Sequence, residues 1–256
     1  MSPVTTNLRT YDMADVHVFE SRKEMAIAAA ENAARLINEA ILERGTSRIM
    51  IATGNSQLDL VEELVKRDIN WKSVHVFHMD EYVGINADHP ASFRRWIRGH
   101  VEDQIHPATV NYIEGDAADV DSEIARYSRL LLAGSLDVAF VGFGENGHIA
   151  FNDPPSADFS DPQTVKRVTL ESDCRYQQVG EGHFENFAMV PTEAITVSCA
   201  GLFRASAWIS CVPERRKAMA VSRALTGPIS TACPASIVRN HKNATVYLDR
   251  ESASLL

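Results

Sequence analysis

The chain has 256 residues, 45% of them hydrophobic and 23% charged, so it can bury a substantial core in one or two domains. Its formal net charge of −9 argues against a general nucleic-acid or anionic-membrane surface, but leaves room for a local basic group that binds a small anion. Four widely spaced cysteines without a CxxC pair, no apolar signal-peptide core and no run of ~18 apolar residues predict a soluble, cytoplasmic protein.

The first half of the chain alternates between predicted strands and helices. A short strand at 16–19 precedes a helix that runs to Glu43; Ser21 and Glu24 have the S-x-x-E form of a capping box, and Gly45 marks the end of the helix. The elements that follow are strands at 48–52, 74–79 and 137–142 and helices at 58–65, 91–104 and 120–132.

The second half is regular except for one long segment. Residues 154–191 have no clear period, and connections of this length are often lids, so we expect a lid at about 155–190. The elements expected beyond it are strands at 194–197, 207–212 and 244–248, a helix at 216–225 and a helical turn at 233–238. This order predicts an α/β fold: one domain, residues 1–256, with a doubly wound, Rossmann-like, mostly parallel sheet and helices on both faces.

Three loops of this predicted fold should meet at one edge of the sheet. In doubly wound sheets, ligands bind beyond the carboxyl ends of the strands. The loops at 53–56, 79–82 and 142–153 each follow a predicted strand. Their convergence predicts a small-molecule site.

The loop at 142–153 combines close-approach glycines with titratable groups. Three glycines occur within six positions, and His148 and Asp153 follow them. His148 suits proton transfer near neutral pH, and Asp153 could fix its tautomer. The alternative is a plain turn followed by a structural histidine.

Asp80 and Glu81 are adjacent carboxylates at a predicted strand end. Neighbouring residues of a strand face opposite sides, so one can enter the crevice while the other braces the loop. A carboxylate placed there could act as a general base, with its pKa raised by partial burial. A solvated acid in a turn is the alternative.

The sequence favours neither a metal nor a nucleotide site. His78, His89 and His100 lie near one another but make neither an HxxxH nor an HExxH spacing. The chain has no GxGxxG motif, and no Walker lysine follows the loop at 53–56.

Two segments are candidates for binding a phosphate. Thr53, Gly54, Asn55 and Ser56 follow a strand and open a helix, so backbone N–H groups and the helix dipole could hold an anion. The run of residues 215–217, Arg-Arg-Lys, starts a predicted helix, where cations are unfavourable unless one of them faces an anion. A solvated basic face is the alternative for this run.

Two motifs together resemble one family over nearly the whole chain. FHMDEYVG, with HPASF downstream, and GENGHIAFNDP are similar to the glucosamine-6-phosphate deaminases, in the wider group that includes 6-phosphogluconolactonases. A lactonase would be expected to show DER in place of DEY and GHTAS in place of GHIAF. The resemblance implies a Rossmann-like fold and a cofactor-free isomerisation and deamination of glucosamine 6-phosphate to fructose 6-phosphate and ammonia.

The resemblance also implies roles for individual residues. His148 would open the sugar ring with help from Asp153 and Asn146, and Asp80 would move a proton between C2 and C1 by way of an enolamine. The phosphate would be held by the loop at 53–56. Further substrate-binding positions implied are Glu81, Gly144, Gly147, Arg175 in the lid, and Lys217. The expected partner is a small sugar phosphate, with no nucleic acid, membrane or metal, and homo-oligomer formation is left open.

Departures from the family pattern keep two other functions open. Relatives commonly carry Glu where this chain has the shorter Asp153, and a second Gly is frequent where Asn55 stands; Asn tolerates left-handed backbone geometry. The basic residues of the allosteric site of hexameric relatives are not cleanly matched, so activation by N-acetylglucosamine 6-phosphate is not expected. The alternatives are a 6-phosphogluconolactonase or other sugar-phosphate isomerase, and a catalytically silent sugar-phosphate sensor.

Overall fold

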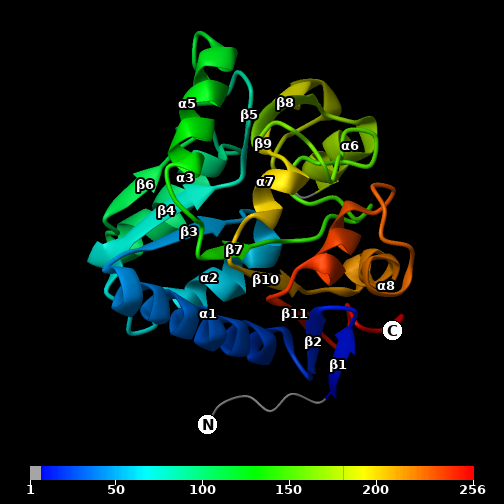
Figure 1. Ribbon diagram of the computed structural model, residues 1–256. Coiled ribbons are helices and arrows are strands. Elements are labelled where there is room, and N and C mark those ends of the chain that lie inside the picture. The colour runs from blue at the N-terminus through cyan, green and yellow to red at the C-terminus, as the bar shows by residue number, and fades with distance from the viewer. Residues whose placement is uncertain (1–6, 181) are drawn as a thin grey trace.

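An eight-stranded sheet forms the centre of the computed structural model, which describes residues 7–180 and 182–256 (Figure 1). Its strand order is β1-β2-β11-β10-β7-β3-β4-β6, and every pairing except β1 with β2 is parallel. The strands are β1 (Asn7–Tyr11), β2 (Ala14–Phe19), β3 (Ser47–Ile51), β4 (Val74–His78), β6 (Thr109–Asn111), β7 (Val138–Phe140), β10 (Ala207–Val212) and β11 (Ala244–Asp249). The predicted mostly parallel α/β fold is confirmed.

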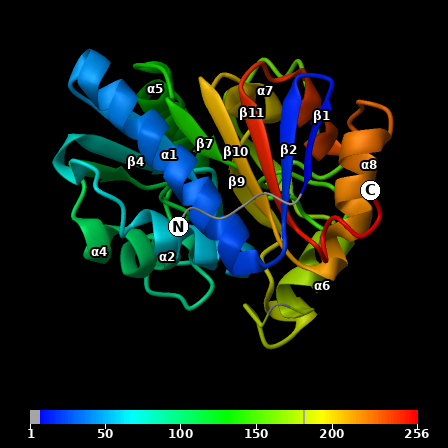
Figure 2. The same cartoon turned by 90° about the horizontal axis from the view of Figure 1, so that it is seen from below.

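Helices cover both faces of this sheet. They are α1 (Arg22–Arg44), α2 (Leu58–Leu64), α3 (Phe93–Ile97), α4 (Asp103–Ile105), α5 (Val120–Leu132), α6 (Ser172–Gly180), α7 (Cys199–Phe203) and α8 (Ala218–Thr226). One apolar core contains side chains of α1, α2, α3 and α4, and the core on the opposite face contains side chains of α5, α7 and α8. Figure 2 shows α1 lying across the strands. No helix in the described parts of the chain is long and apolar enough to cross a membrane.

The predicted ends of α1 are confirmed in detail. The Glu24 amide donates to Ser21 Oγ at 3.2 Å, and the Ser21 amide donates to Glu24 Oε2 at 3.1 Å, which completes the capping box. Gly45 follows the helix with φ 79°, a left-handed conformation that glycine adopts without steric cost. The helix expected at 91–104 is present as α3 and α4, joined by a π-helical turn over residues 98–102.

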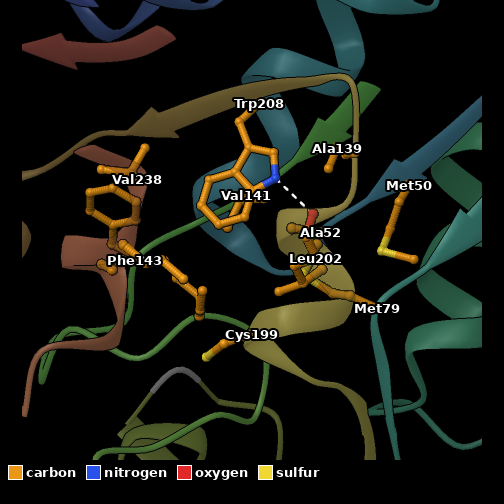
Figure 3. Close-up of a cluster of buried hydrophobic side chains, with 14 of the residues drawn as sticks. Met50, Ala52, Met79, Ala139, Val141, Phe143, Cys199, Leu202, Trp208 and Val238 are labelled. Atoms are coloured by element: carbon orange, nitrogen blue, oxygen red, sulfur yellow. Dashed lines mark hydrogen bonds between the residues drawn. The ribbon is translucent and has the colours of Figure 1, made fainter. Parts of the chain in front are cut away.

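The core between the sheet and α7 supports the loop that follows β7. Trp208 of β10 is fully buried there and donates its indole N–H to the Leu202 carbonyl at 2.9 Å (Figure 3). Val141 and Phe143, at the carboxyl end of β7, pack into the same core. The loop that leaves β7 therefore starts from a fixed position.

A second, three-stranded antiparallel sheet stands beside the main one. It consists of β5 (Asp80–Tyr82), β9 (Glu193–Val197) and β8 (Val165–Thr169), in the order β5-β9-β8. Residues 155–190, in which no helix or strand was predicted, contain β8 and α6. β8 is hidden in the sequence because its buried face carries a lysine: Lys166 lies on the same face as Val168 and forms a buried ion pair with Asp161 at 2.8 Å.

The order of the main sheet creates a switch point. From β3 the chain adds β4 and β6 on one side, and then returns to place β7 on the other side of β3. The loops after β3 and β7 consequently run in opposite directions at the carboxyl edge, where α/β sheets bind their ligands.

Candidate active site

A cavity opens at this switch point. Its walls come from the segments that follow β3, β4, β7 and β10, together with part of the segment at 155–190. The structure brings together at this cavity the predicted site residues Thr53, Gly54, Asn55, Ser56, Asp80, Gly144, His148 and Lys217.

Asp80 places a buried carboxylate in the cavity wall. The residue is 7% exposed, and its backbone is held in β5 opposite Thr196 of β9. Burial raises the pKa of the Asp80 carboxyl well above its usual range, and the nearby Glu81 carboxyl raises it further. Among residues 7–180 and 182–256, no group donates a hydrogen bond to this carboxylate. Asp80 therefore has the burial and the free oxygens that a general base requires.

His78 fixes the backbone of Asp80 from behind. Its Nε2 accepts a hydrogen bond from the Ile113 amide at 2.9 Å, so Nδ1 carries the proton and donates to the Asp80 carbonyl at 2.9 Å. Burial lowers the pKa of His78 to about 3, and the Arg94 charge acts in the same direction, against the hydrogen bond to Asp80. His78 is thus neutral at physiological pH and serves as a rigid support.

Glu81 lies outside the cavity, contrary to its expected role in substrate binding. It is fully buried and accepts hydrogen bonds from the amides of Phe93 and Arg94, at 3.2 and 3.0 Å, and from the Ser92 hydroxyl at 2.8 Å. Burial raises the pKa of Glu81, and these hydrogen bonds oppose the increase. Glu81 braces the start of α3, which is the role that the alternation along the strand left for one of the two carboxylates.

His148 lies against the glycine-rich loop. A Cβ atom on Gly144 would lie 2.2 Å from His148 Cε1, so only glycine fits beneath the imidazole ring. The His148 amide donates to Asn146 Oδ1 at 2.9 Å, and Asn146 Nδ2 donates to Asp153 Oδ1 at 2.7 Å. Asn146 therefore joins the backbone of His148 to the carboxylate of Asp153 without itself lining the cavity.

Asp153 lies behind His148 and is 2% exposed. Burial alone would raise its pKa, but interactions with His148, Asn146 and the Cys174 thiol outweigh burial and lower it. Asp153 is consequently ionised at neutral pH and can stabilise a protonated His148.

The predicted phosphate-binding loop forms one wall of the cavity. Gly54 has φ 101° and ψ 169°, a conformation essentially restricted to glycine, and a short 3-10 helix over Asn55–Gln57 leads into α2. Lys217, which precedes α8, is 3% exposed and lines the cavity as well. A buried cation at the wall of an open cavity suits an anionic ligand.

Two other predicted substrate-binding residues lie away from the cavity. Gly147 has φ 91°, and a Cβ there would lie 2.6 Å from Cys233 Sγ, so this glycine serves chain packing. Arg175 donates from Nη2 to the carbonyls of Phe187 and Val190, at 2.9 and 2.8 Å, and stacks on the Phe187 ring at 3.9 Å. In this conformation it holds the segment at 155–190 together.

Sequence reasoning missed several lining residues from that same segment. Gln177, Gln178 and His183 line the cavity opposite the strand ends, and Tyr82 Oη donates to Gln178 Oε1 at 2.6 Å. Tyr82 could have been found from the sequence, because it lies two residues after the predicted site residue Asp80. The sequence of residues 155–190, which has no clear period, gave no signal for the two glutamines or the histidine. In the described parts of the chain, no three His, Cys, Asp or Glu side chains gather as metal ligands.

The fold and the site define a class: α/β proteins with a buried carboxylate and an imidazole at the switch point of a parallel sheet. Residues 20–247 match the sequence model of the family described as glucosamine-6-phosphate isomerases/6-phosphogluconolactonase. The match covers most of the chain, and the protein belongs to this family.

Individual relatives agree with this assignment. The chain is 33% identical over 233 residues to a protein of Listeria innocua named glucosamine-6-phosphate deaminase, covering 91% of this chain and 97% of that one. It is 35% identical over 208 residues to a protein of the same name from Exiguobacterium sibiricum, with 81% of each chain covered.

Solved structures have the same fold. The structure of a monomeric glucosamine-6-phosphate deaminase matches with a TM-score of 0.84 at 27% identity, over 94% of this chain and 99% of that one. A 6-phosphogluconolactonase from Shewanella baltica matches with a TM-score of 0.76 at 18% identity, over 94% and 97% of the two chains.

Proposed function

We propose that this protein is a glucosamine-6-phosphate deaminase, which converts glucosamine 6-phosphate and water into fructose 6-phosphate and ammonia. The observation that carries the proposal is the buried Asp80 carboxylate in one cavity with His148 and Lys217. The names of relatives that match over most of their length support the same activity.

The first step is the opening of the sugar ring at His148. A proton leaves the O1 hydroxyl and another is delivered to the ring oxygen, and a single imidazole can perform both transfers near neutral pH. The ionised Asp153 lowers the cost of the imidazolium formed in between. Asn146 keeps the two groups in place through its contacts to both.

The second step is proton transfer by Asp80. Asp80 takes the C2 proton of the open-chain sugar and gives an enolamine, and then returns a proton to C1. Water adds to the resulting imine at C2, and ammonia leaves. A rigidly held carboxylate can reach both adjacent carbons, and its raised pKa brings its proton affinity closer to the operating pH.

The proposed position of the phosphate group is between two parts of the cavity wall. The loop of Thr53, Gly54, Asn55 and Ser56 and the ammonium of Lys217 are its proposed ligands. Arg175 joins them only if it leaves the Phe187 and Val190 carbonyls, so a role for Arg175 requires the segment at 155–190 to rearrange as a lid.

The proposed setting is a single domain in the cytoplasm that needs no cofactor and has a sugar phosphate as its partner. Homo-oligomer formation is left open, and light scattering of the purified protein tests it.

The experiment is an assay with glucosamine 6-phosphate that follows ammonia and fructose 6-phosphate together. Equimolar amounts of the two products are expected. 6-Phosphogluconolactone runs in parallel, with spontaneous hydrolysis subtracted. Enzyme-dependent lactone hydrolysis without ammonia would instead assign a lactonase, and silence on both substrates would contradict the proposal.

A further inference from the structure

Arg22, the first residue of α1, connects two walls of the cavity from outside it. Its Nη2 donates to the Asn55 carbonyl at 2.8 Å, and its Nε donates to the Asp59 carboxylate of α2. Its Nη1 donates to Glu214 Oε1 at 2.6 Å. Asn55 belongs to the phosphate-binding loop, and Glu214 lies three residues before Lys217. One guanidinium therefore contacts both the loop at 53–56 and the turn that leads to Lys217.

Arg22 is placed to support these segments and not to bind the anion itself. It does not line the cavity, and its charge is balanced by two carboxylates, Asp59 and Glu214. Its side chain is 31% exposed, so these pairs are only partly screened by solvent. A planar guanidinium can bind a carbonyl and two carboxylates in fixed directions at once, which a lysine ammonium cannot do as rigidly.

The partner of Arg22 on the second wall is held in an unusual conformation. Glu214 has φ 80°, which is unfavourable for a residue with a side chain. Its amide donates to Asp249 Oδ2 at 3.0 Å, and its Oε2 accepts from Arg216 Nε at 2.5 Å. Without the ion pair to Arg22, we expect this turn to relax toward an ordinary backbone conformation and to shift Lys217.

Arg216 extends the network to a third wall. Its Nη1 donates to Glu145 Oε1 at 3.0 Å, and Glu145 belongs to the glycine-rich loop that also carries His148. The loops after β3, β7 and β10 are thus linked by charged hydrogen bonds on the outer side of the cavity. Hydrogen bonds between ionised groups are the stronger kind and have defined directions.

We propose that Arg22 is a positioning residue for the phosphate site: it fixes the spacing between the loop at 53–56 and Lys217, so that both contact one phosphoryl group. The inference rests on the phosphate site of the proposed function. A preformed spacing avoids ordering two separate segments when the ligand binds, so Arg22 acts on affinity. The phosphate is remote from the reacting carbons, and the chemical step changes less.

The test compares Arg22→Ala, Arg22→Lys and Asp59→Asn with the wild type. For Arg22→Ala we expect KM for glucosamine 6-phosphate to rise about tenfold, while kcat stays within about twofold of the wild-type value. This is the pattern for losing an interaction that stabilises the bound substrate and the transition state equally. Calorimetric titration with inorganic phosphate should show a similar loss of affinity. Arg22→Lys and Asp59→Asn should lie between Arg22→Ala and the wild type.

Arg35→Ala is the matched control, because Arg35 lies on the same helix, is exposed, and donates hydrogen bonds to Glu39 and Asn32 of that helix. It should leave phosphate affinity and KM unchanged. If Arg22→Ala folds, unchanged phosphate affinity and unchanged KM in that variant would overturn the inference. If it does not fold, unchanged phosphate affinity and KM in both Arg22→Lys and Asp59→Asn would overturn it.

Phosphate titration separates this inference from the proposed function. Weakened phosphate binding in the Arg22 variants of a protein that releases no ammonia would support the inference and reject the deaminase. A wild type that does not bind phosphate would remove the inference.

Discussion

His148 Nδ1 lies 3.3 Å from Asp153 Oδ1, yet the two atoms do not have hydrogen-bond geometry and Nδ1 is buried without a hydrogen-bond partner. The same carboxylate oxygen accepts a hydrogen bond from the side-chain Nδ2 of Asn146 at 2.7 Å. The family resemblance marks Asp153 as a departure, because Glu, one methylene longer, is the common residue at this position. The short side chain leaves the imidazole near its counter-charge but not bonded to it.

This relationship makes Asp153 sensitive to both charge and length. Asp153→Asn removes the counter-charge of the imidazolium, and kcat/KM should fall about 10- to 100-fold, the range for losing a hydrogen bond or close contact to a charged group. Asp153→Glu can reach Nδ1 and should retain or raise kcat/KM. Steady-state kinetics check both variants, with melting temperatures to detect overpacking. Full activity in Asp153→Asn would remove Asp153 from the ring-opening step.

The raised pKa of Asp80 predicts a stability that depends on pH. Its folded-state pKa lies above the unfolded value of about 3.9, so the folded state binds more protons and the free energy of unfolding falls as pH rises between the two values. Asp80→Asn cannot ionise. It should therefore be more stable than the wild type at pH 7, and the difference should vanish below about pH 4. Urea unfolding at several pH values measures this, and an advantage that does not depend on pH would contradict it.

His78 should affect turnover through the placement of Asp80. His78→Ala removes the donor to the Asp80 carbonyl and the acceptor for Ile113, so we expect kcat to fall about tenfold with little change in KM. Because His78 is neutral throughout the working range, the acid limb of the pH–rate profile should not come from this residue. A loss confined to KM would refute the positioning role.

Lys217 lines the cavity, whereas Arg175 lies away from it. Lys217→Ala should raise KM for the sugar phosphate about 10- to 100-fold, as expected for a lost charged contact. Arg175→Ala should raise KM as well only if the segment at 155–190 closes on the ligand, and otherwise should chiefly lower stability by freeing the Phe187 and Val190 carbonyls. An unchanged KM in both variants would place the phosphate elsewhere.

Much of the fold could be predicted from local signals. The Ser21 and Glu24 capping box and Gly45 fixed the ends of α1, and apolar runs located β3, β4, β10 and β11. The elements missed were short or lacked periodicity. Most side chains of β1 are exposed, β6 has only three residues, and α7 has only five. Each of these elements therefore has too few buried positions to show a periodic pattern in the sequence.

The site residues that could be predicted are those with a suitable side chain or glycine loop directly after a predicted strand. Asp80, His148 and the loop at 53–56 follow strands, and the fold brought them together. The sequence did not show that Glu81 points away from the cavity, because its hydrogen bonds to α3 depend on the course of the chain after β5. Residues 155–190 have no clear period in the sequence, and tertiary contacts determine how this segment packs. The positions of Arg175, Gln177 and His183 relative to the cavity could therefore not be predicted.

The most direct measurement is the ammonia and fructose 6-phosphate assay run on the wild type and on Asp80→Asn together, with phosphate titration of both. We expect equimolar products from the wild type. For Asp80→Asn we expect kcat to fall at least about a thousandfold, in the range for removal of a general base, with phosphate affinity retained. Full turnover in Asp80→Asn would contradict the assignment of Asp80 as the base. A wild type that makes no ammonia would contradict the deaminase itself.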